Sequence, residues 1–148
     1  MSGGINPTTP QLKAVKSLMD AYLTLDVKNV KPFVSKDFKF QTFPKIDQHP
    51  VEARDAHFER YGALFSSLRK IEITYHEVIE APGRVIFHAT ADIVTADGTE
   101  LDYDTLAILD LVEEDGGLKI SKFRDFSDPE KRHRLHGWAA ETLAKGEA

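Results

Sequence analysis

The second half of the 148-residue chain carries a run of long strand-like segments, and no other feature constrains the fold as strongly. The segments lie near residues 70–80, 84–95, 101–113 and 118–126. Short turn signals separate them: Pro82-Gly83, Asp97-Gly98 and Gly116-Gly117. Short turns of this kind join antiparallel neighbours. Because strands much longer than the usual length of about 5–6 residues must twist and curl, the run predicts a curved antiparallel sheet.

The first half of the chain has the periodicity of helices instead. Thr9 suits the cap and Pro10 the first position of a helix, and apolar residues follow at helical spacing over residues 12–23. The remaining elements predicted are a short helix capped by Asp26, a strand over residues 37–43, a helix beginning at Pro50 and a last helix beginning at Ser127.

The predicted order is therefore α-α-β-α-β-β-β-β-α, which favours the α+β class over a parallel α/β sheet. A curved sheet wrapped around N-terminal helices would enclose a concave space for a ligand. We expect residues 1–9 to be a flexible tail and residues 10–145 to form a single domain, because 148 residues leave little room for a second one.

Composition excludes several classes of function. The chain has no cysteine, which excludes a disulfide scaffold, a cysteine zinc site and a thiol nucleophile. With 19 Lys and Arg against 24 Asp and Glu, it has no basic surface typical of nucleic-acid binding. No apolar run is long enough to cross a membrane, and no signal peptide is visible, so we expect a cytoplasmic protein.

The sequence also predicts neither a cofactor nor a metal. His133 and His136 are three residues apart, but they lie in the basic stretch KRHRLH, and no acidic pattern nearby completes a metal site. The nine glycines never form a phosphate-binding loop or a dinucleotide fingerprint.

Five segments resemble a known superfamily. They are AVKSLMDAYLTLDVKNVKPFVSKDF, FPKIDQHP, TYHEVIEA, VIFHATAD and GLKISKFRDFSD. Together they resemble the nuclear-transport-factor-2-like superfamily in its SnoaL-like branch, especially small fungal members, over roughly Pro10 to Asp128. The resemblance implies a cone-shaped fold and a homodimer formed through the sheet. It does not choose among activities, because the same fold hosts cofactor-free isomerases, cyclases and dehydratases as well as proteins that only bind.

Asp125 is the first candidate for chemistry. The resemblance implies that Phe123 and Asp125 line the pocket, where burial would raise the pKa of the carboxyl enough for acid–base work. Strand alternation is against this, because the apolar Ile120 and Phe126 lie on the other parity. Asp125 in solvent, paired with a basic neighbour, is therefore the alternative.

Asp104 and His88 are further candidates on neighbouring strands. Some fungal members carry a carboxylate at a place similar to Asp104, although this residue equally suits an exposed strand end. His88 could move protons because an unperturbed histidine titrates near neutrality. Alternation again opposes a pocket role for His88, since Phe87 and the residues at two-residue spacing from it form the more apolar face of the strand.

Tyr22 could donate a hydrogen bond to a ligand from the first helix, as a tyrosine does in several members. A tyrosine among apolar residues at helical spacing also suits the core, and Tyr61 has the same ambiguity. Phe40, Phe87 and Phe123 are predicted apolar walls. Many fungal relatives have a histidine on the first strand where this chain has Phe40 and Gln41, and if catalysis in those relatives needs it, the activity here would be different or absent. Gln41 is a further ligand-binding candidate.

Two functions remain open from the sequence. The first is a cofactor-free isomerase, cyclase or dehydratase that acts on an apolar, polyketide- or terpenoid-like molecule through Asp and His. The second is a protein that binds such a molecule without turnover, or a dimer whose cavity is filled by its own side chains.

Overall fold

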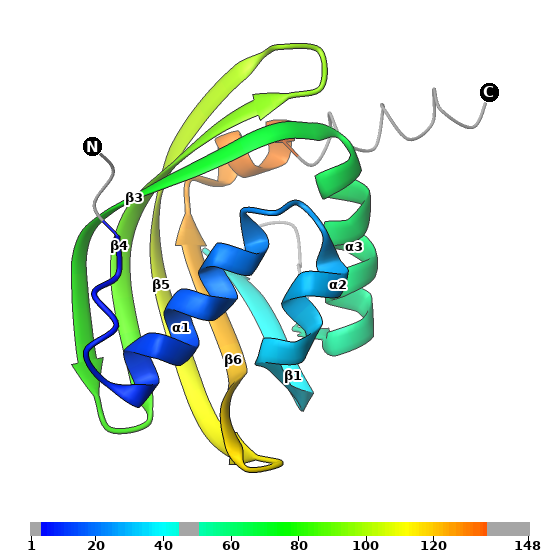
Figure 1. Cartoon of the computed structure of the whole chain (residues 1–148). Helices are drawn as coiled ribbons and strands as arrows, with labels where there is room; N and C mark the ends of the chain where they lie inside the picture. The colour runs from blue at the N-terminus through cyan, green and yellow to red at the C-terminus, as the bar shows by residue number, and fades with distance from the viewer. Residues whose placement is uncertain (1–3, 45–50, 136–148) are drawn as a thin grey trace.

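Residues 4–44 and 51–135 are described by the computed structural model shown in Figure 1. The elements of its first half are α1 (Pro10–Tyr22), α2 (Val27–Val30), the 3-10 turn η1 (Lys31–Phe33), β1 (Val34–Phe43), β2 (Glu52–Ala53) and α3 (Arg54–Ser66). The long strands of the second half are β3 (Leu68–Ala81), β4 (Arg84–Thr95), β5 (Glu100–Glu114) and β6 (Gly117–Ser127). Residues 129–135 are helical. The predicted α+β class is confirmed, and the two-residue β2 is an addition.

The strands form one six-stranded sheet in the order β2-β1-β6-β5-β4-β3. Strands β3 to β6 form the predicted antiparallel meander. Strand β1 pairs in parallel with β6, so the sheet is mixed rather than wholly antiparallel. A parallel partner needs a long crossover connection, and here α3 and the other three long strands supply it.

Local signals in the sequence fix the helix starts. The Thr9 side chain accepts a hydrogen bond from the Leu12 amide at 3.2 Å, and Pro10 occupies the first turn of α1. Asp26 caps α2 by accepting from the Lys28 amide at 2.9 Å. Helix α3 begins at Arg54, whereas the predicted start at Pro50 lies outside the described residues. At the β3–β4 turn, Gly83 has a φ of 73°, which glycine adopts at little cost.

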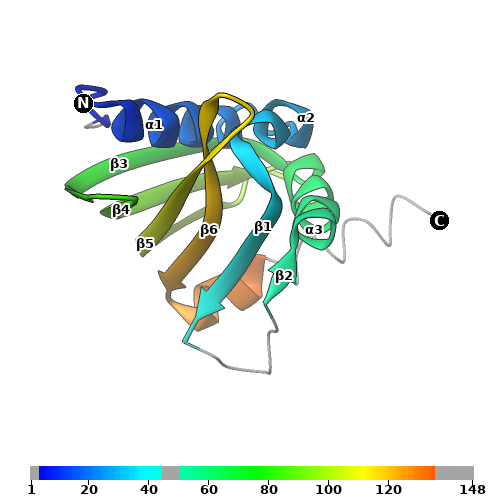
Figure 2. The ribbon, with the colours of Figure 1, turned by 90° about the horizontal axis from the view of Figure 1, so that it is seen from below.

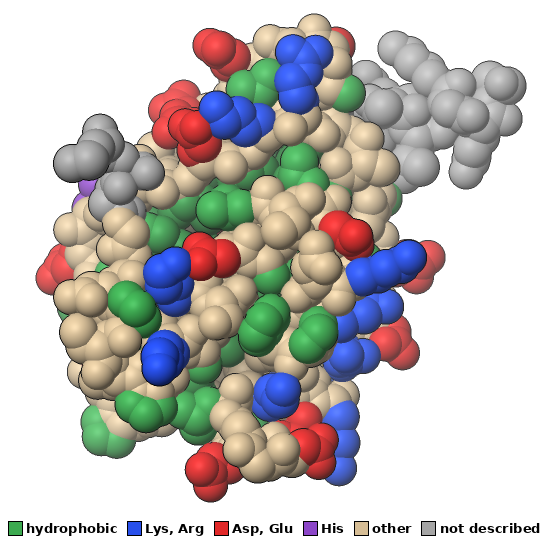
Figure 3. Space-filling model, viewed as in Figure 1, with side chains coloured by type: hydrophobic (Ala, Val, Ile, Leu, Met, Phe, Trp, Pro, Cys, Tyr) green, Lys and Arg blue, Asp and Glu red, His purple; other side chains and the backbone are tan. Residues whose placement is uncertain are grey.

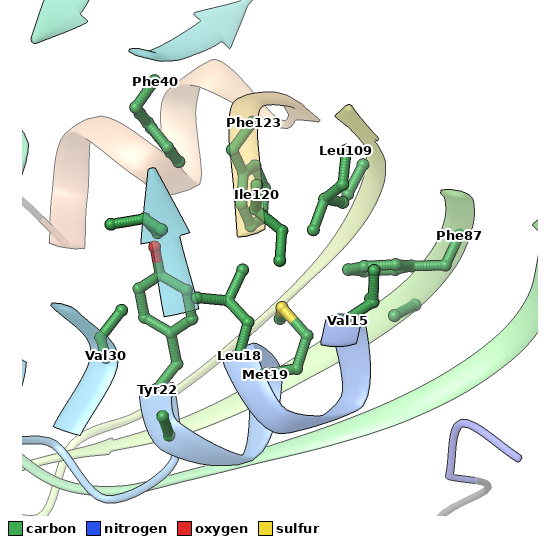
Figure 4. Packing of buried hydrophobic residues seen from close by; sticks show 14 of the residues in the cluster. Val15, Leu18, Met19, Tyr22, Val30, Phe40, Phe87, Leu109, Ile120 and Phe123 are labelled. Carbon is green, nitrogen blue, oxygen red and sulfur yellow. The ribbon is translucent and has the colours of Figure 1, made fainter. Parts of the chain in front are cut away.

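The helices cover one face of the sheet (Figure 2). Helix α1 packs on β4 and β6, and α3 packs on β1 and β3. The inner face of α1 buries Val15, Leu18, Met19 and Tyr22 against the sheet (Figure 4). Ile5, in the segment predicted to be a tail, is also buried in this core. None of the helices among the described residues is both long enough and apolar enough to span a membrane.

Burial alternates cleanly along β4. Val85, Phe87, Ala89, Ala91 and Ile93 are buried and face the helices, and the residues between them face outward. In β5 the buried positions Ala107, Leu109 and Leu111 follow the same rule. The inner faces of these two strands therefore supply the floor of the core.

Replacing Leu18 by Ala tests this packing. Leu18 is fully buried, so we expect Leu18→Ala to lower the free energy of unfolding by about 2–5 kcal/mol through lost apolar contacts and a residual cavity. Urea denaturation followed by circular dichroism measures the change. The control is Leu23→Ala just after α1, where the side chain is 36% exposed and the expected loss is below about 1 kcal/mol. Equal losses in the two variants would contradict the packing described.

Candidate functional site

An apolar cavity of about 80 Å³ lies between the helices and the inner face of the sheet. Its polar groups come from five residues: Tyr22, Tyr61, Tyr103, Thr105 and Asp125. The apolar walls include Met19, Phe40, Phe65, Phe87, Phe123 and Leu135. In Figure 3 hydrophobic side chains gather in the hollow between α1 and β3, and acidic and basic side chains are interspersed over the rest of that face. The cavity thus combines an apolar wall with a few polar groups, as small-molecule sites do.

A register shift turns Asp125 into the cavity. Asp110 pairs with Lys122, but the next residue, Leu111, pairs with Ile120, so Ser121 is an extra residue in β6. Such a bulge reverses the parity of a strand on its two sides. Ile120 before it and Phe123 after it are therefore both buried. The conflict between alternation and resemblance in the sequence arises from this bulge.

The Asp125 carboxyl lies in surroundings that favour its protonated form. Burial raises the pKa of Asp125. The Thr105 hydroxyl donates a hydrogen bond to Oδ1, and this bond, with the charges of Arg132 and Arg60, partly offsets the rise. Asp125 therefore keeps its proton to a higher pH than an ordinary aspartic acid does.

A chain of polar residues lies on the helix side of the cavity, and its members are hydrogen-bonded except between His57 and Glu52. The Tyr22 hydroxyl is 3.0 Å from Nε2 of His57, a fully buried residue of α3. Nδ1 of His57 is 3.7 Å from Oε1 of Glu52. Arg60 donates two hydrogen bonds to Glu52, from Nε at 2.8 Å and from Nη2 at 2.6 Å. The cavity-lining hydroxyl of Tyr22 is thus connected through His57 to an ion pair.

The charges of Glu52 and Arg60 favour one position of the proton on the neutral His57 ring. Burial raises the pKa of Glu52, but His57 and Arg60 outweigh it and bring the pKa to about 2. Burial lowers the pKa of His57, so its ring is neutral near pH 7. A neutral ring has one N–H, and the ionised Glu52 favours that hydrogen on Nδ1. Nε2 then accepts the Tyr22 O–H, and the Tyr22 oxygen can accept a hydrogen bond from a ligand.

Aromatic rings enclose His57. The Phe40 ring stacks on it with centroids 4.2 Å apart, and the Tyr61 ring lies 4.3 Å away on centroids. The Arg60 guanidinium lies 5.0 Å from the Tyr61 ring centroid. These rings exclude water and hold the imidazole in one orientation.

Sequence reasoning did not identify His57 or Glu52 as site residues. His57 falls on the apolar stripe of its helix and so suits a core position. Its one distinguishing signal is that a buried imidazole must find hydrogen-bond partners. Its hydrogen-bond partner Tyr22 comes from α1 and its charged neighbour Glu52 from β2, and no local pattern connects either element to α3.

The structure divides the predicted site residues between two faces of the sheet. Six line the cavity: Tyr22, Phe40, Tyr61, Phe87, Phe123 and Asp125. Gln41 is buried but is not part of the cavity lining. His88 and Asp104 lie on the opposite face, with Nε2 and Oδ2 3.9 Å apart. The pocket role considered for these two residues is corrected. His88 alternates with the buried Phe87 and Ala89, and Asp104 alternates with Tyr103 and Thr105, which line the cavity.

Comparisons with known proteins agree with the fold. A family model described as a SnoaL-like domain matches residues 15–123. Two similar solved structures are from Penicillium species. PrhC from Penicillium brasilianum has a TM-score of 0.74 at 12% identity, covering 90% of this chain and 89% of that one. BvnE pinacolase from Penicillium brevicompactum has a TM-score of 0.73 at 10% identity, covering 87% and 90%.

A third similar structure is TerC, co-crystallized with polyporic acid. Its TM-score is 0.65 at 17% identity, and the match covers 87% of this chain and 99% of that one. No curated protein matches the chain. At such identities the structural likeness establishes the fold alone.

Replacing Glu52 by Gln tests the buried ion pair through its pH dependence. Because folding depresses the pKa of Glu52 from 4.5 to about 2, its contribution is present above about pH 4.5 and is lost as the pH falls toward 2. We expect the stability difference between wild type and Glu52→Gln to shrink by up to about 3 kcal/mol over that window. Urea denaturation at a series of pH values measures it.

The matched control is Glu59→Gln, at an exposed position on α3. We expect its stability difference from wild type to stay nearly constant over the same window. A Glu52→Gln difference that also stays constant with pH would contradict the ion pair.

Proposed function

Because the chain belongs to the SnoaL-like domain family, within the NTF2-like superfamily, we propose that it is a cofactor-free acid–base enzyme acting on a compact, mostly apolar molecule. The reaction class is isomerisation, cyclisation or dehydration. One observation carries the proposal: a carboxyl with a raised pKa and a neutral, hydrogen-bonded histidine relay meet at the same apolar cavity.

The proposed roles follow from the two protonation states. Tyr22 and His57 act together as the base. The Tyr22 oxygen takes a proton from the carbon next to a substrate carbonyl, while the O–H proton of Tyr22 passes to Nε2 of His57. The imidazolium formed faces the Glu52 carboxylate, which stabilises the charge. Asp125 gives its proton to the carbonyl oxygen, so an enol forms with no net change in charge.

The size of the cavity restricts the substrate. A volume of about 80 Å³ is below the ~150 Å³ of an engineered cavity that binds benzene, and well below the ~300–1,000 Å³ usual for drug-sized ligands. A compact ketone or alcohol therefore fits best. A polyketide- or terpenoid-like molecule requires movement of wall residues, of which Leu135 near the C-terminal end of the described chain is one.

Binding without turnover is the second candidate function. The narrow, aromatic cavity favours it, because side chains already fill much of the space that a large substrate would need. In this function Asp125 and Tyr22 only orient the ligand. The two functions differ in whether a bound molecule loses a proton.

Proton exchange of a small probe tests the enzyme proposal. The probe is 4-hydroxybutan-2-one in D₂O, and proton NMR follows both deuterium entry next to the carbonyl and loss of water. We expect wild type to accelerate exchange, and Asp125→Asn and Tyr22→Phe each to reduce that acceleration by about 100-fold or more, the usual contribution of general acid–base catalysis. Exchange should also decline as the pH rises through the raised pKa of Asp125 and its acid form is lost.

Two variants outside the cavity serve as controls. Tyr75→Phe and Asp92→Asn should exchange the probe like wild type, because neither residue lines the cavity. Amide chemical shifts measure probe binding separately. Binding with no exchange in wild type would establish the second function, and full exchange in Asp125→Asn would refute the assigned roles.

The part of the outer sheet face next to the β3–β4 turn is the surface proposed for homodimer formation, which leaves the part around His88 and Asp104 open. Ile79 and Val112 are large apolar side chains exposed on their strands. We expect light scattering coupled to size exclusion to give a dimer mass for wild type and a monomer mass for Ile79→Lys, because a buried unpaired charge disfavours association. Leu23→Lys, after α1, is the control and should remain dimeric. A monomeric wild type at all concentrations would refute the dimer.

A further inference from the structure

A second group of titratable side chains lies on the outer face of the sheet, away from the cavity. His76, His88 and Asp104 come from three adjacent strands, β3, β4 and β5, and each offers a ligand atom within 4.8 Å of the other two. The two imidazole rings have centroids 4.8 Å apart. Among the described residues this is the one such group that could hold a metal ion.

His76 lies on this face at a bulge in β3. Tyr75 pairs with Ala89, and Glu77 pairs with His88, so His76 is an extra residue opposite no partner. A bulge of this kind re-aims a side chain locally. Thr90 lies two residues after His88 on the same face of β4, and it pairs with Asp104 of β5. The sheet thus sets the three side chains beside one another.

Thr90 holds two members of the group in place. Its hydroxyl lies 2.6 Å from Nε2 of His76 and donates a hydrogen bond to Oδ1 of Asp104 at 2.6 Å. The carboxylate is therefore held near the two rings before any ligand arrives. Residues whose positions are already fixed lose less entropy on binding.

We propose that His76, His88 and Asp104 bind a divalent transition-metal ion, with Zn²⁺ as the representative. Two imidazoles and one carboxylate are typical zinc ligands, whereas Ca²⁺ and Mg²⁺ require oxygen ligands. Ligand atoms of a tetrahedral zinc site lie about 3.4 Å apart. His88 and Asp104 are 44% and 71% exposed on their side chains, so small rotations about their side-chain bonds close the gap.

The surroundings suit a metal ion that keeps one coordination position open. His88 and Asp104 line a surface concavity of about 540 Å³ that also contains Asp102 and Lys131. The Lys131 ammonium lies 3.9 Å from the Asp102 carboxylate, which balances its charge. Three protein ligands leave the fourth zinc position to water or to a small anion entering from the concavity.

Isothermal titration of the chelator-treated full chain with zinc chloride tests the site. We expect saturable binding of one Zn²⁺ by the three-residue group. His76→Ala, His88→Ala and Asp104→Asn should each weaken this binding by at least about tenfold, since even loss of an outer-shell partner costs that much. All three positions lie on the sheet surface, and circular dichroism confirms that each variant is folded.

The control is His133→Ala, at an exposed histidine outside the group, which should bind Zn²⁺ like wild type. Co²⁺ provides a second readout, because a tetrahedral site gives intense visible absorption that His88→Ala should lose. No saturable Zn²⁺ binding in wild type, or equal binding in His76→Ala and wild type, would overturn the proposal. These outcomes are independent of the proposed enzyme activity, because no member of the group lines the cavity.

Discussion

The extra residue at Ser121 in β6 decides what the cavity contains. Without the register shift, a strand that buries Ile120 would point Phe123 and Asp125 away from the helices. With it, the strand buries apolar residues before the bulge and presents an aromatic ring and a carboxyl after it. Phe126 is then turned to the other face, where its ring stacks on Phe43 with centroids 4.6 Å apart. The carboxyl group of the cavity thus depends on one backbone irregularity.

Burial of polar groups imposes the second constraint. His57 lies among aromatic rings. Burying both imidazole nitrogens there without partners would destabilise the fold by more than the packing of the ring stabilises it. The Tyr22 hydroxyl is the hydrogen-bond partner of Nε2, the Glu52 carboxylate places a negative charge 3.7 Å from Nδ1, and Arg60 neutralises that carboxylate. The cost of burying each of these polar groups is offset by its contact with the next group. This requirement connects α1, β2 and α3. It also orients the Tyr22 hydroxyl, so that its hydrogen points to His57 and its oxygen can accept a hydrogen bond in the cavity.

Much of the fold could be predicted from local patterns, because helix caps and glycine turns act over a few residues. Thr9 and Asp26 cap the helices predicted for them, and the long strands lie close to the predicted ranges. The parallel pairing of β1 with β6 could not be predicted, because it joins segments about 80 residues apart. Alternation correctly favoured an outward His88, whereas a bulge hid the inward direction of Asp125. His76 was missed for a different reason, because its neighbours His88 and Asp104 come from two other strands.

The two proposed sites lie on the two faces of the same strands. In β4, Phe87 lines the cavity and its neighbour His88 joins the outer group; in β5, Thr105 bonds Asp125 and its neighbour Asp104 faces outward. Because adjacent residues of a strand point to opposite faces, substitutions can alter one group with little direct contact with the other. Coupling between them would have to pass through the backbone of β4 and β5, which is paired on both sides in the middle of the sheet. Such a strand resists displacement, so the chemistry of the cavity and cation binding on the outer face should operate independently.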